Sequence, residues 1–492
     1  MWKQLLATKP VAPAAIEANN ELKRTLGPWA LIALGIGAII GTGIFVLTGV
    51  AAAENAGPAL VLSFILAGTV CGLSALCYAE FSAMIPESGS AYSYSYATLG
   101  EFIAWFIGWN LVLEYLVSMS AVAVGWSGYV VPFLRHLGIT LPAELTTSPL
   151  TQGVGSFSIT TTGALVNLPA IFVCLALTAV CYVGIRQSSM ANIVIVIIKL
   201  LVIFLFIGFG VHYIAPDNWH PFIPDRICDT AAAVTAQCKP GHFGWFGIVE
   251  GASIIFFAYI GFDAVSTAAQ EARNPQRDMP IGIIVSLIVC TILYIIVALV
   301  LTGMVPFAQL NVPHPVGYAV EQVPALKTWL APLIELGALA GLSSVMLVMM
   351  IAQPRIFYSM SKDGLLPKVF AKVHPKYRTP HINTVITGVI AAVLAGFLPI
   401  DILAELTNIG TLLAFMTVCI AVPILRRTRP DLPRPFRTPW APVTATLGAA
   451  GCLYLIYGLP LDTWVRLIIW TAVGVAIYFG YGYRHSRLRA QR

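Results

Sequence analysis

The chain has 492 residues, of which 58% are hydrophobic and only 10% are charged. Soluble domains carry roughly 25% charged residues, and one soluble core could not bury so much apolar surface. The net charge of +6 comes from basic residues that lie between and beyond the apolar stretches, so it reflects membrane topology and not a nucleic-acid partner.

Apolar stretches of about 20 residues are long enough to span a bilayer as helices. The chain has twelve, which begin near Trp29, Ala59, Phe102, Val166, Asn192, Trp245, Ile281, Leu330, Asn383, Ile402, Ala441 and Trp464. The short alternating runs of a β-barrel are absent from the sequence. We therefore expect an all-α membrane protein. Its twelve-helix domain, embedded in the lipid bilayer, covers residues 29–483.

Charge placement predicts the orientation of this domain. Most of the 28 Lys and Arg residues fall on one side of a twelve-span arrangement, which is the side of both chain ends. The positive-inside rule places that side in the cytosol, across a plasma (inner) membrane. Residues 1–28 lack the apolar core of a cleavable signal peptide and are expected to form a cytosolic tail. Residues 484–492 form a second, basic cytosolic tail.

The first span contains four glycines within nine residues: Gly35, Gly37, Gly41 and Gly43. Each interior glycine costs a helix about 1 kcal/mol relative to alanine. Close helix packing would explain one small-xxx-small pair, but a break that binds a substrate explains the whole run better. In that interpretation the N–H groups at Gly41, Thr42 and Gly43 bind a carboxylate, and carbonyls near Ile39 bind an ammonium.

Two ionisable residues lie deep within later spans. Glu114 is about thirteen residues into span three, and Lys199 is ten residues, or about 15 Å, into span five. We expect Glu114 to join span three to backbone groups freed at the breaks, in preference to direct substrate contact. A lysine at mid-membrane is a functional candidate, and because buried lysines can release their proton, Lys199 is expected to couple transport to protons. A fixed structural cation is the alternative.

Nine cysteines are scattered without metal-ligand spacing, so no metal site is expected. Cys228 and Cys238 differ from the others because both lie in the long outside loop between spans five and six. A disulfide between them and two free thiols are both open alternatives.

The sixth span is interrupted at residues 259–263, Tyr-Ile-Gly-Phe-Asp. Breaks at matching places in two halves point to a transporter site between inverted repeats, here at approximately 29–214 and 245–425, with two peripheral helices at 441–483. Asp263 is expected to cap the half-helix that follows. Glu250, Glu335 and Glu405 lie nearer span ends or lack a comparable setting and are interpreted as structural.

Four segments carry a family resemblance: residues 35–45, residues 78–92, residues 256–263 (Phe-Phe-Ala-Tyr-Ile-Gly-Phe-Asp) and residues 361–367 (Ser-Lys-Asp-Gly-Leu-Leu-Pro). In this order they resemble the amino acid–polyamine–organocation (APC) superfamily, and within it bacterial members of the cationic amino acid transporter family. The resemblance runs from about Lys23 to the last span.

The resemblance implies the 5+5 inverted-repeat, leucine-transporter-type fold, with helices 1 and 6 broken, and several site residues. Carbonyls at Phe257, Ala258 and Ile260 would complete the ammonium site. Lys199 would replace the cation of sodium-coupled relatives, contacting the Gly37 carbonyl and a span-eight hydroxyl, either Ser343 or Ser344.

The predicted function is secondary active import of L-amino acids by alternating access, coupled to protons. Because Leu342 and its neighbours in span eight offer a cationic side chain few acceptors, small neutral substrates such as alanine are preferred, and cationic ones such as arginine are the alternative. A sodium-independent exchanger with Lys199 as a fixed counter-charge is the rival. The sequence shows no converging nucleophile, metal-ligand or acid–base set, so neither an enzyme nor a cofactor is expected.

Overall fold

The computed structural model describes residues 5–10, 26–87, 89–152, 159–183, 189–225, 243–377 and 379–490. Within these ranges, eight helical segments are long and apolar enough to cross a membrane. The first of them, Gly43–Met84, holds the second part of span one together with span two. Four shorter apolar helices supply the start of span one and spans four, nine and eleven: α2 (Pro28–Ile39), α7 (Leu168–Val183), α15 (His381–Phe397) and α17 (Ala441–Tyr457). The predicted twelve-span helical fold is confirmed.

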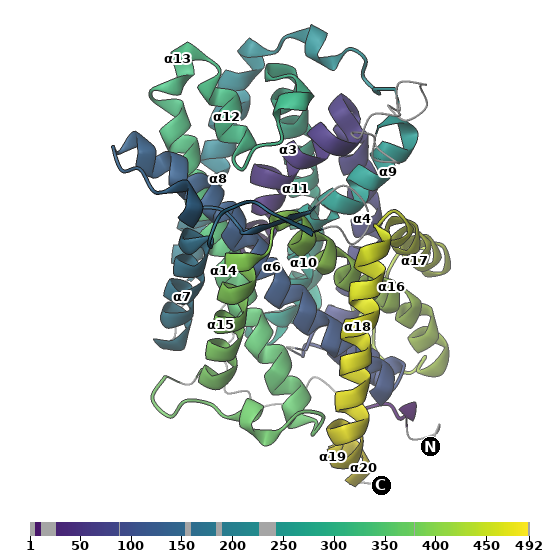
Figure 1. Ribbon diagram of the computed structural model, residues 1–492. Coiled ribbons are helices and arrows are strands. Elements are labelled where there is room, and N and C mark those ends of the chain that lie inside the picture. Colours follow the sequence, from purple (N-terminus) through teal and green to yellow (C-terminus); the bar gives the residue numbers. More distant parts are fainter. Residues whose placement is uncertain are drawn as a thin grey trace.

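The long spans form an upright bundle (Figure 1). Lipid cannot satisfy backbone polar groups, so apolar sequences that cross it adopt helices. The continuous spans are α4 (Leu60–Met84), α6 (Glu101–His136), α8 (Ser189–Gly210), α11 (Pro275–Met304), α14 (Leu330–Lys362), α16 (Ile400–Thr428) and α18 (Leu461–Ile477). The interrupted first span continues from α2 through η1 (Gly43–Leu47), α3 (Thr48–Ala51), η2 (Ala52–Ala56) and η3 (Gly57–Ala59); the sixth consists of α9 (Gly244–Ile255), η9 (Phe256–Tyr259) and α10 (Phe262–Thr267).

Short elements lie between the spans or follow the last one. They are α5 (Ala91–Thr98), η4 (Ala143–Leu145), β1 (Leu150–Gln152), β2 (Ile159–Thr161), η5 (Val211–Tyr213), η6 (Pro216–Trp219), η10 (Ala269–Glu271), η11 (Phe307–Gln309), α12 (Pro315–Glu321), α13 (Pro324–Lys327), η12 (Lys368–Ala371), η13 (Tyr478–Gly482), α19 (Tyr483–His485) and α20 (Arg487–Ala490).

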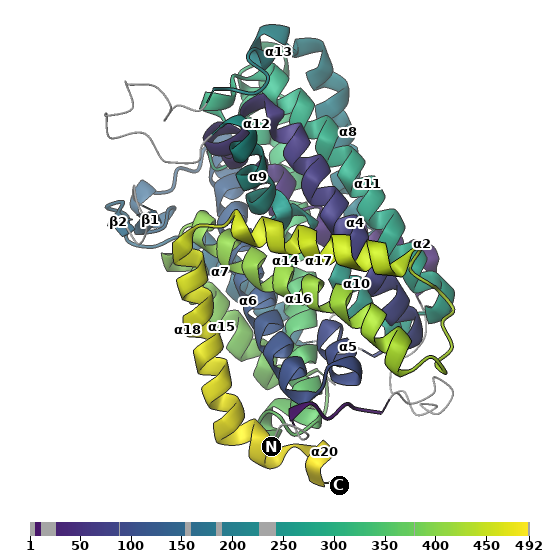
Figure 2. The same ribbon diagram turned by 90° about the vertical axis from the view of Figure 1, so that its right-hand side faces the viewer.

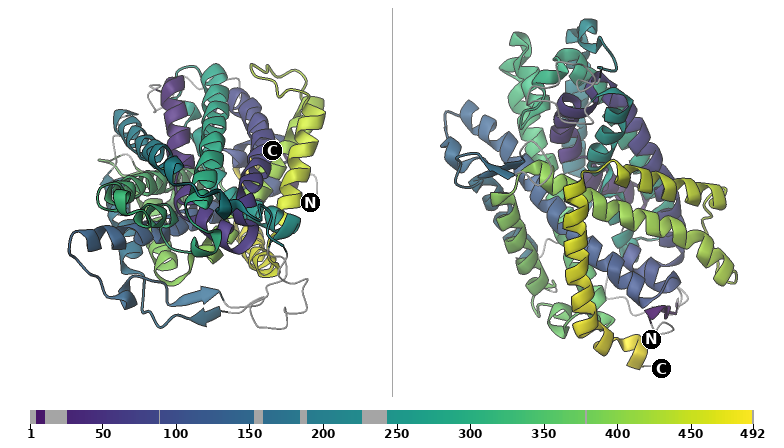
Figure 3. Two further views of the ribbon diagram at one scale, coloured as in Figure 1. Left: turned by 90° about the horizontal axis from the view of Figure 1, so that it is seen from above. Right: turned by 45° about the vertical axis from the view of Figure 1, so that its right-hand side comes forward.

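The connection between α6 and α7 contains a small hairpin. Its polar sequence is typical of a flexible segment, yet β1 and β2 pair antiparallel, with Leu150 opposite Thr161. The Ser148 hydroxyl donates to the Phe397 carbonyl oxygen at 2.6 Å and anchors the connection to the end of α15. The strands project from the side of the bundle (Figure 3).

Both terminal segments meet at the start of α6. The Glu101 amide donates to the Ala7 carbonyl at 3.0 Å, and the fully buried Glu101 carboxylate accepts hydrogen bonds from Tyr478 and Ser486. Residues 5–10 and α20 therefore lie on one face of the bundle, called here the terminal face, while α12 and α13 lie at the opposite face (Figure 1).

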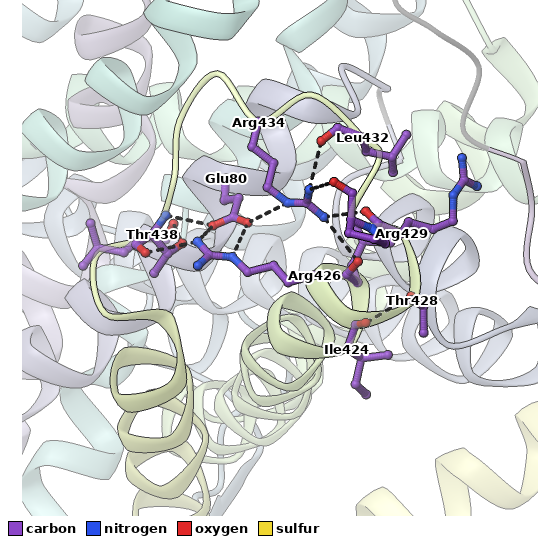
Figure 4. Close-up of polar contacts among 11 residues, drawn as sticks. Glu80, Ile424, Arg426, Thr428, Arg429, Leu432, Arg434 and Thr438 are labelled. Atoms are coloured by element: carbon purple, nitrogen blue, oxygen red, sulfur yellow. Dashed lines mark hydrogen bonds and ion pairs between the residues drawn. The ribbon is translucent and has the colours of Figure 1, made fainter.

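A buried acid fastens the terminal-face ends of α4 and α16. The Glu80 carboxylate accepts two hydrogen bonds from the Arg426 guanidinium, at 2.9 and 2.5 Å. It also accepts one from the Thr438 amide at 2.8 Å, and Arg434 Nε lies 3.7 Å away (Figure 4). One carboxylate thus holds the helix ends and the loop that leads to α17.

The last two spans lie on the outside of the bundle, with α17 steeply inclined to α18 (Figure 2). Trp109 of α6 stacks on Trp470 of α18, with ring centroids 4.5 Å apart. Each indole N–H donates to the backbone carbonyl of the other tryptophan, at 2.9 and 3.1 Å. This reciprocal pair holds α18 against the core helix α6.

Candidate functional site

The break in the first span is short. Helix α2 ends at Ile39, and Ile40 has extended backbone (φ −74°, ψ 102°) before helical structure resumes at Thr42. The predicted interruption at residues 37–43 is therefore confirmed and narrowed to residues 40 and 41. Because the chain turns out of the helix there, the N–H groups of Thr42 and Gly43 lack a carbonyl one turn earlier.

The break in the sixth span begins earlier than predicted. Helix α9 ends at Ile255, a tighter 3-10 turn covers Phe256–Tyr259, and Ile260 is extended. Gly261 has φ +125°, and the next helix begins at Phe262. A side chain at Gly261 would place its Cβ 2.7 Å from the Ala38 carbonyl oxygen, so the two breaks lie directly against each other.

Lys199 ends the first half-helix from a different span. Its Nζ donates to the carbonyl oxygens of Gly37 at 2.7 Å and Ile40 at 3.0 Å, and the side chain is fully buried. The third partner is the Ser344 hydroxyl at 3.0 Å. An ammonium group at the negative end of a helix is favourable, and this one satisfies carbonyls that the break exposes.

The structure distinguishes between the two serines that the sequence offered. The Ser343 hydroxyl donates to the Leu339 carbonyl of its own helix at 2.8 Å and does not reach Lys199. The predicted contact belongs to Ser344. Leu342 is fully buried and lies one turn before Val345, whose side chain a Cβ at Gly41 would meet at 2.8 Å.

Tyr294 is a site residue that the sequence did not reveal. Its hydroxyl, on α11, lies 2.8 Å from the carbonyl oxygens of both Ile39 and Ala258. It therefore joins the first break to the second through two of the carbonyls assigned to the substrate ammonium. A tyrosine in an apolar helix usually reflects packing, so its spacing carried no signal.

The glycines of the first span also allow close packing. A Cβ at Gly43 would lie 2.2 Å from Ala258 Cα, and one at Gly35 would lie 2.4 Å from Ser286 Oγ on α11. The packing role and the proposed binding role thus coincide at Gly43, where no larger residue would let the two broken segments touch.

Asp263 accepts a backbone amide at the second break, as expected of a cap, but its position in the helix differs from the prediction. It is the second residue of α10 and not its N-cap, because the helix begins at Phe262. Its carboxylate turns back to accept the Gly261 amide at 3.1 Å and the Tyr115 hydroxyl of α6. The capping function is therefore carried out from inside the helix and is supported by α6.

The predicted contact of Glu114 with the backbone groups at the breaks is not found among the described residues. Neither carboxylate oxygen has a hydrogen-bond partner among the described residues, although the side chain is fully buried. The neighbouring Thr411 hydroxyl donates instead to the Thr407 carbonyl at 3.0 Å. The structure thus shows no bond from Glu114 to the freed backbone. The buried Thr42 hydroxyl, at the first break, likewise has no partner among these residues.

Cys228 and Cys238 lie outside the described residues. The seven cysteines within them are free and buried, as expected for packing residues in spans.

Comparisons with known proteins agree with this architecture. Residues 26–478 match the family model described as "Amino acid permease". The chain is 48% identical to a methylthioribose transporter of Bacillus subtilis, over 98% of this chain and 99% of the relative. It is 46% identical to the branched-chain amino acid permease BcaP of the same organism, over 96% of each chain. It is 36% identical to the vacuolar cationic amino acid transporter 4 of Arabidopsis thaliana, over 84% of this chain and 65% of the relative. The chain is a membrane transporter and not an enzyme, and it belongs to the amino acid permease family of the APC superfamily.

Proposed function

We propose that this protein is a proton-coupled secondary active transporter that imports L-amino acids with neutral side chains across the plasma membrane. The observation that carries the proposal is the meeting of two broken helices around a buried lysine. Carbonyls and amide groups are exposed there in the complementary arrangement that a zwitterion requires. The resemblance to inverted-repeat transporters supports repeats at about 29–214 and 245–425, and the basic terminal face supports cytosolic termini.

The substrate carboxylate binds at Gly41, Thr42 and Gly43 in this proposal. These residues begin the half-helix that runs toward the opposite face, and a helix start favours an anion. The unpartnered Thr42 hydroxyl adds a donor beside the amides.

The substrate ammonium binds at the carbonyls of Ile39, Phe257, Ala258 and Ile260. A carbonyl oxygen has two lone pairs, so the single hydroxyl hydrogen that Tyr294 shares between the Ile39 and Ala258 carbonyls leaves both of them able to accept a bond from the substrate. Tyr294 then holds the two carbonyls at a fixed separation. We infer that it is a positioning residue for the ammonium group.

Coupling is assigned to Lys199. With its proton, Lys199 closes the end of α2 through the Gly37 and Ile40 carbonyls. Without its proton, it loses the charge that favours the helix end, and the first break is released. Protonation would thereby set which arrangement of the broken span is stable.

The side-chain pocket favours neutral substrates. Val345 supplies apolar surface beside Gly41, and the buried Leu342 lies one turn before it. The BcaP relative transports branched-chain amino acids by name. Alanine and branched-chain amino acids are the proposed substrates. Cationic substrates such as arginine are a second candidate, because Glu114 offers an unpartnered carboxylate near the breaks and other relatives are named cationic transporters.

A second candidate function is sodium-independent exchange. The three hydrogen bonds of Lys199 also suit a permanently charged ammonium that replaces a metal cation. In that case Lys199 would hold the first break without releasing its proton.

Purified protein in liposomes tests these proposals. Alanine uptake against its gradient, driven by an imposed proton gradient without internal substrate, supports coupling. Uptake that requires amino acid inside the liposome supports exchange. Competition by arginine, compared between wild type and Glu114→Gln, separates the substrate classes: competition that disappears in the variant would establish the cationic one.

A further inference from the structure

Four side chains converge where α12 covers the ends of α6 and α14 at the opposite face. His136 is the last residue of α6, and its Nδ1 lies 3.0 Å from Glu335 Oε2 in the second turn of α14. Glu321 ends α12, and His314 Nε2, just before that helix, lies 3.7 Å from Glu321 Oε1. One ligand atom each of His136, Glu321 and Glu335 lies within 4.8 Å of the other two.

The ion pairs within this cluster leave two buried polar atoms without a hydrogen-bond partner among the described residues. Glu335 is fully buried, yet its second oxygen, Oε1, has no hydrogen-bond partner among the described residues. The buried Nδ1 of His314 has none either. A buried carboxylate oxygen without a donor is costly, and a cation between the three ligand atoms would remove that cost.

We propose that His136, Glu321 and Glu335 form a binding site for a divalent transition-metal ion of the zinc type. Imidazole and carboxylate are ligands that zinc accepts at about 2.0–2.2 Å, which places the ligand atoms of a tetrahedral site about 3.3–3.6 Å apart. The ligand atoms now lie within 4.8 Å of one another, so they would have to draw closer together around the ion. His314 is a positioning residue that holds the Glu321 carboxylate.

The site joins α12, which packs over the first broken span, to the ends of α6 and α14. Helix α12 packs against η1 and α3 of the first broken span, and it packs against α14. Val316 of α12 closes a small apolar cavity with Phe45 and Ile334, and the Tyr129 hydroxyl of α6 donates to the Phe45 carbonyl at 2.5 Å. Opening a path from the opposite face to the breaks requires α12 to separate from α6 and α14. A metal ion bound to all three helices stabilises the arrangement in which that path is closed.

Titration of the purified full-length protein with zinc chloride, after removal of any histidine tag, tests the site. We expect one zinc ion per chain and a higher melting temperature with zinc. His136→Ala and Glu321→Gln should each weaken binding at least about tenfold, and His314→Ala should weaken it less. These residues are partly exposed, with side-chain exposures of 32%, 22% and 17%. Glu321→Gln and His314→Ala should keep the zinc-free melting temperature, whereas His136→Ala also removes the partner of buried Glu335 and should lower it.

His212→Ala is the matched control, because the only bond of this exposed histidine ring within the described ranges is to the Gly208 carbonyl, one turn earlier, at 3.0 Å. Its zinc affinity should equal that of the wild type. Absence of zinc binding, or an affinity of His136→Ala and Glu321→Gln equal to that of the wild type, would overturn the proposal. Binding is measured without transport, so the result is independent of the proposed substrate and coupling. In liposomes, zinc added at the opposite face should then slow uptake by the wild type and spare His136→Ala.

Discussion

The ammonium group of Lys199 donates to the Gly37 carbonyl over 2.7 Å, so that a residue of α8 ends the helix α2. Most helices end through groups of their own chain segment. Here the end of the first half-helix depends on a titratable side chain from another span, and this contact is the basis of the proposed coupling between protonation and transport.

Lys199→Met keeps most of the side-chain volume and removes the charge. We expect proton-driven uptake to disappear and the pH dependence of the remaining uptake to flatten, because the Gly37 and Ile40 carbonyls lose their common donor. Uptake rates across neutral and mildly acidic pH check this. Lys199→Arg, which stays charged, should also lose proton coupling but should retain exchange. Unchanged proton coupling in Lys199→Met would contradict the assignment.

Tyr294→Phe removes one hydroxyl between the two breaks. The KM for alanine should rise by about tenfold, equivalent to about 1.4 kcal/mol, because the Ile39 and Ala258 carbonyls are no longer held together. Tyr478→Phe is the control, since the buried Tyr478 hydroxyl also bonds a buried acceptor, the Glu101 carboxylate at 2.9 Å, but lies at the terminal face and not at the breaks. Both variants should lose similar stability, and an equal rise in KM would refute the positioning role.

Gly43→Ala should abolish transport. The added Cβ would lie 2.2 Å from Ala258 Cα, so the broken segments must move apart, with a cost of typically 1–3 kcal/mol for overpacking. Gly72→Ala on α4 adds the same methyl group where nothing lies within 4 Å, and it should keep full activity. Initial uptake rates, normalised to folded protein, give the comparison. Normal activity in Gly43→Ala would show that the breaks do not need this contact.

Glu80→Gln should lower the free energy of unfolding by about 3–5 kcal/mol, because Arg426 loses a buried anionic partner. Thermal unfolding in detergent measures the effect. Asp431→Asn breaks the exposed pair with Arg429 at 3.0 Å, and no change in melting temperature is expected there. Equal effects of the two substitutions would show that burial of the Glu80 pair is unimportant.

Lys9 attaches the N-terminal segment to Asp363 at 3.4 Å and to Glu87 at 3.5 Å. Burial lowers the pKa of Lys9, but these carboxylates outweigh it and raise the pKa above its usual value of 10.5. The stabilising contribution of the charged lysine is therefore fully present below pH 10.5 and is lost only as pH rises through the raised pKa.

Hydrogen exchange measures this attachment through the Lys9 amide, which donates to the Tyr96 carbonyl at 3.0 Å. Its protection factor should stay constant from neutral to moderately alkaline pH and fall in Lys9→Met. Lys362→Met, which removes a lysine that stacks on Tyr358 4.6 Å away, should leave it unchanged. Loss of protection near neutral pH in the wild type would contradict this account.

Much of the fold and the centre of the site could be predicted from residue type and position. Glycine runs in apolar spans indicated both breaks, and the depth of Lys199 indicated that its side chain lies buried beside them. The sequence could not choose between Ser343 and Ser344, because neighbouring residues on a helix point about 100° apart and the rotation of α14 depends on its packing. It could not reveal Tyr294, whose bond joins two breaks distant in sequence. From the sequence alone Glu335 was interpreted as structural. Its proximity to Glu321 depends on how α12 packs against α14, which the sequence does not show.

The convergence of both terminal segments on Glu101 makes the two ends of the polypeptide practical neighbours. Halves of a split fluorescent protein fused to either end would meet in the same aqueous compartment and become fluorescent. A single compartment-specific label on one fusion would then report the location of the other. The sidedness of the whole transporter can therefore be read in living cells from one pair of tags.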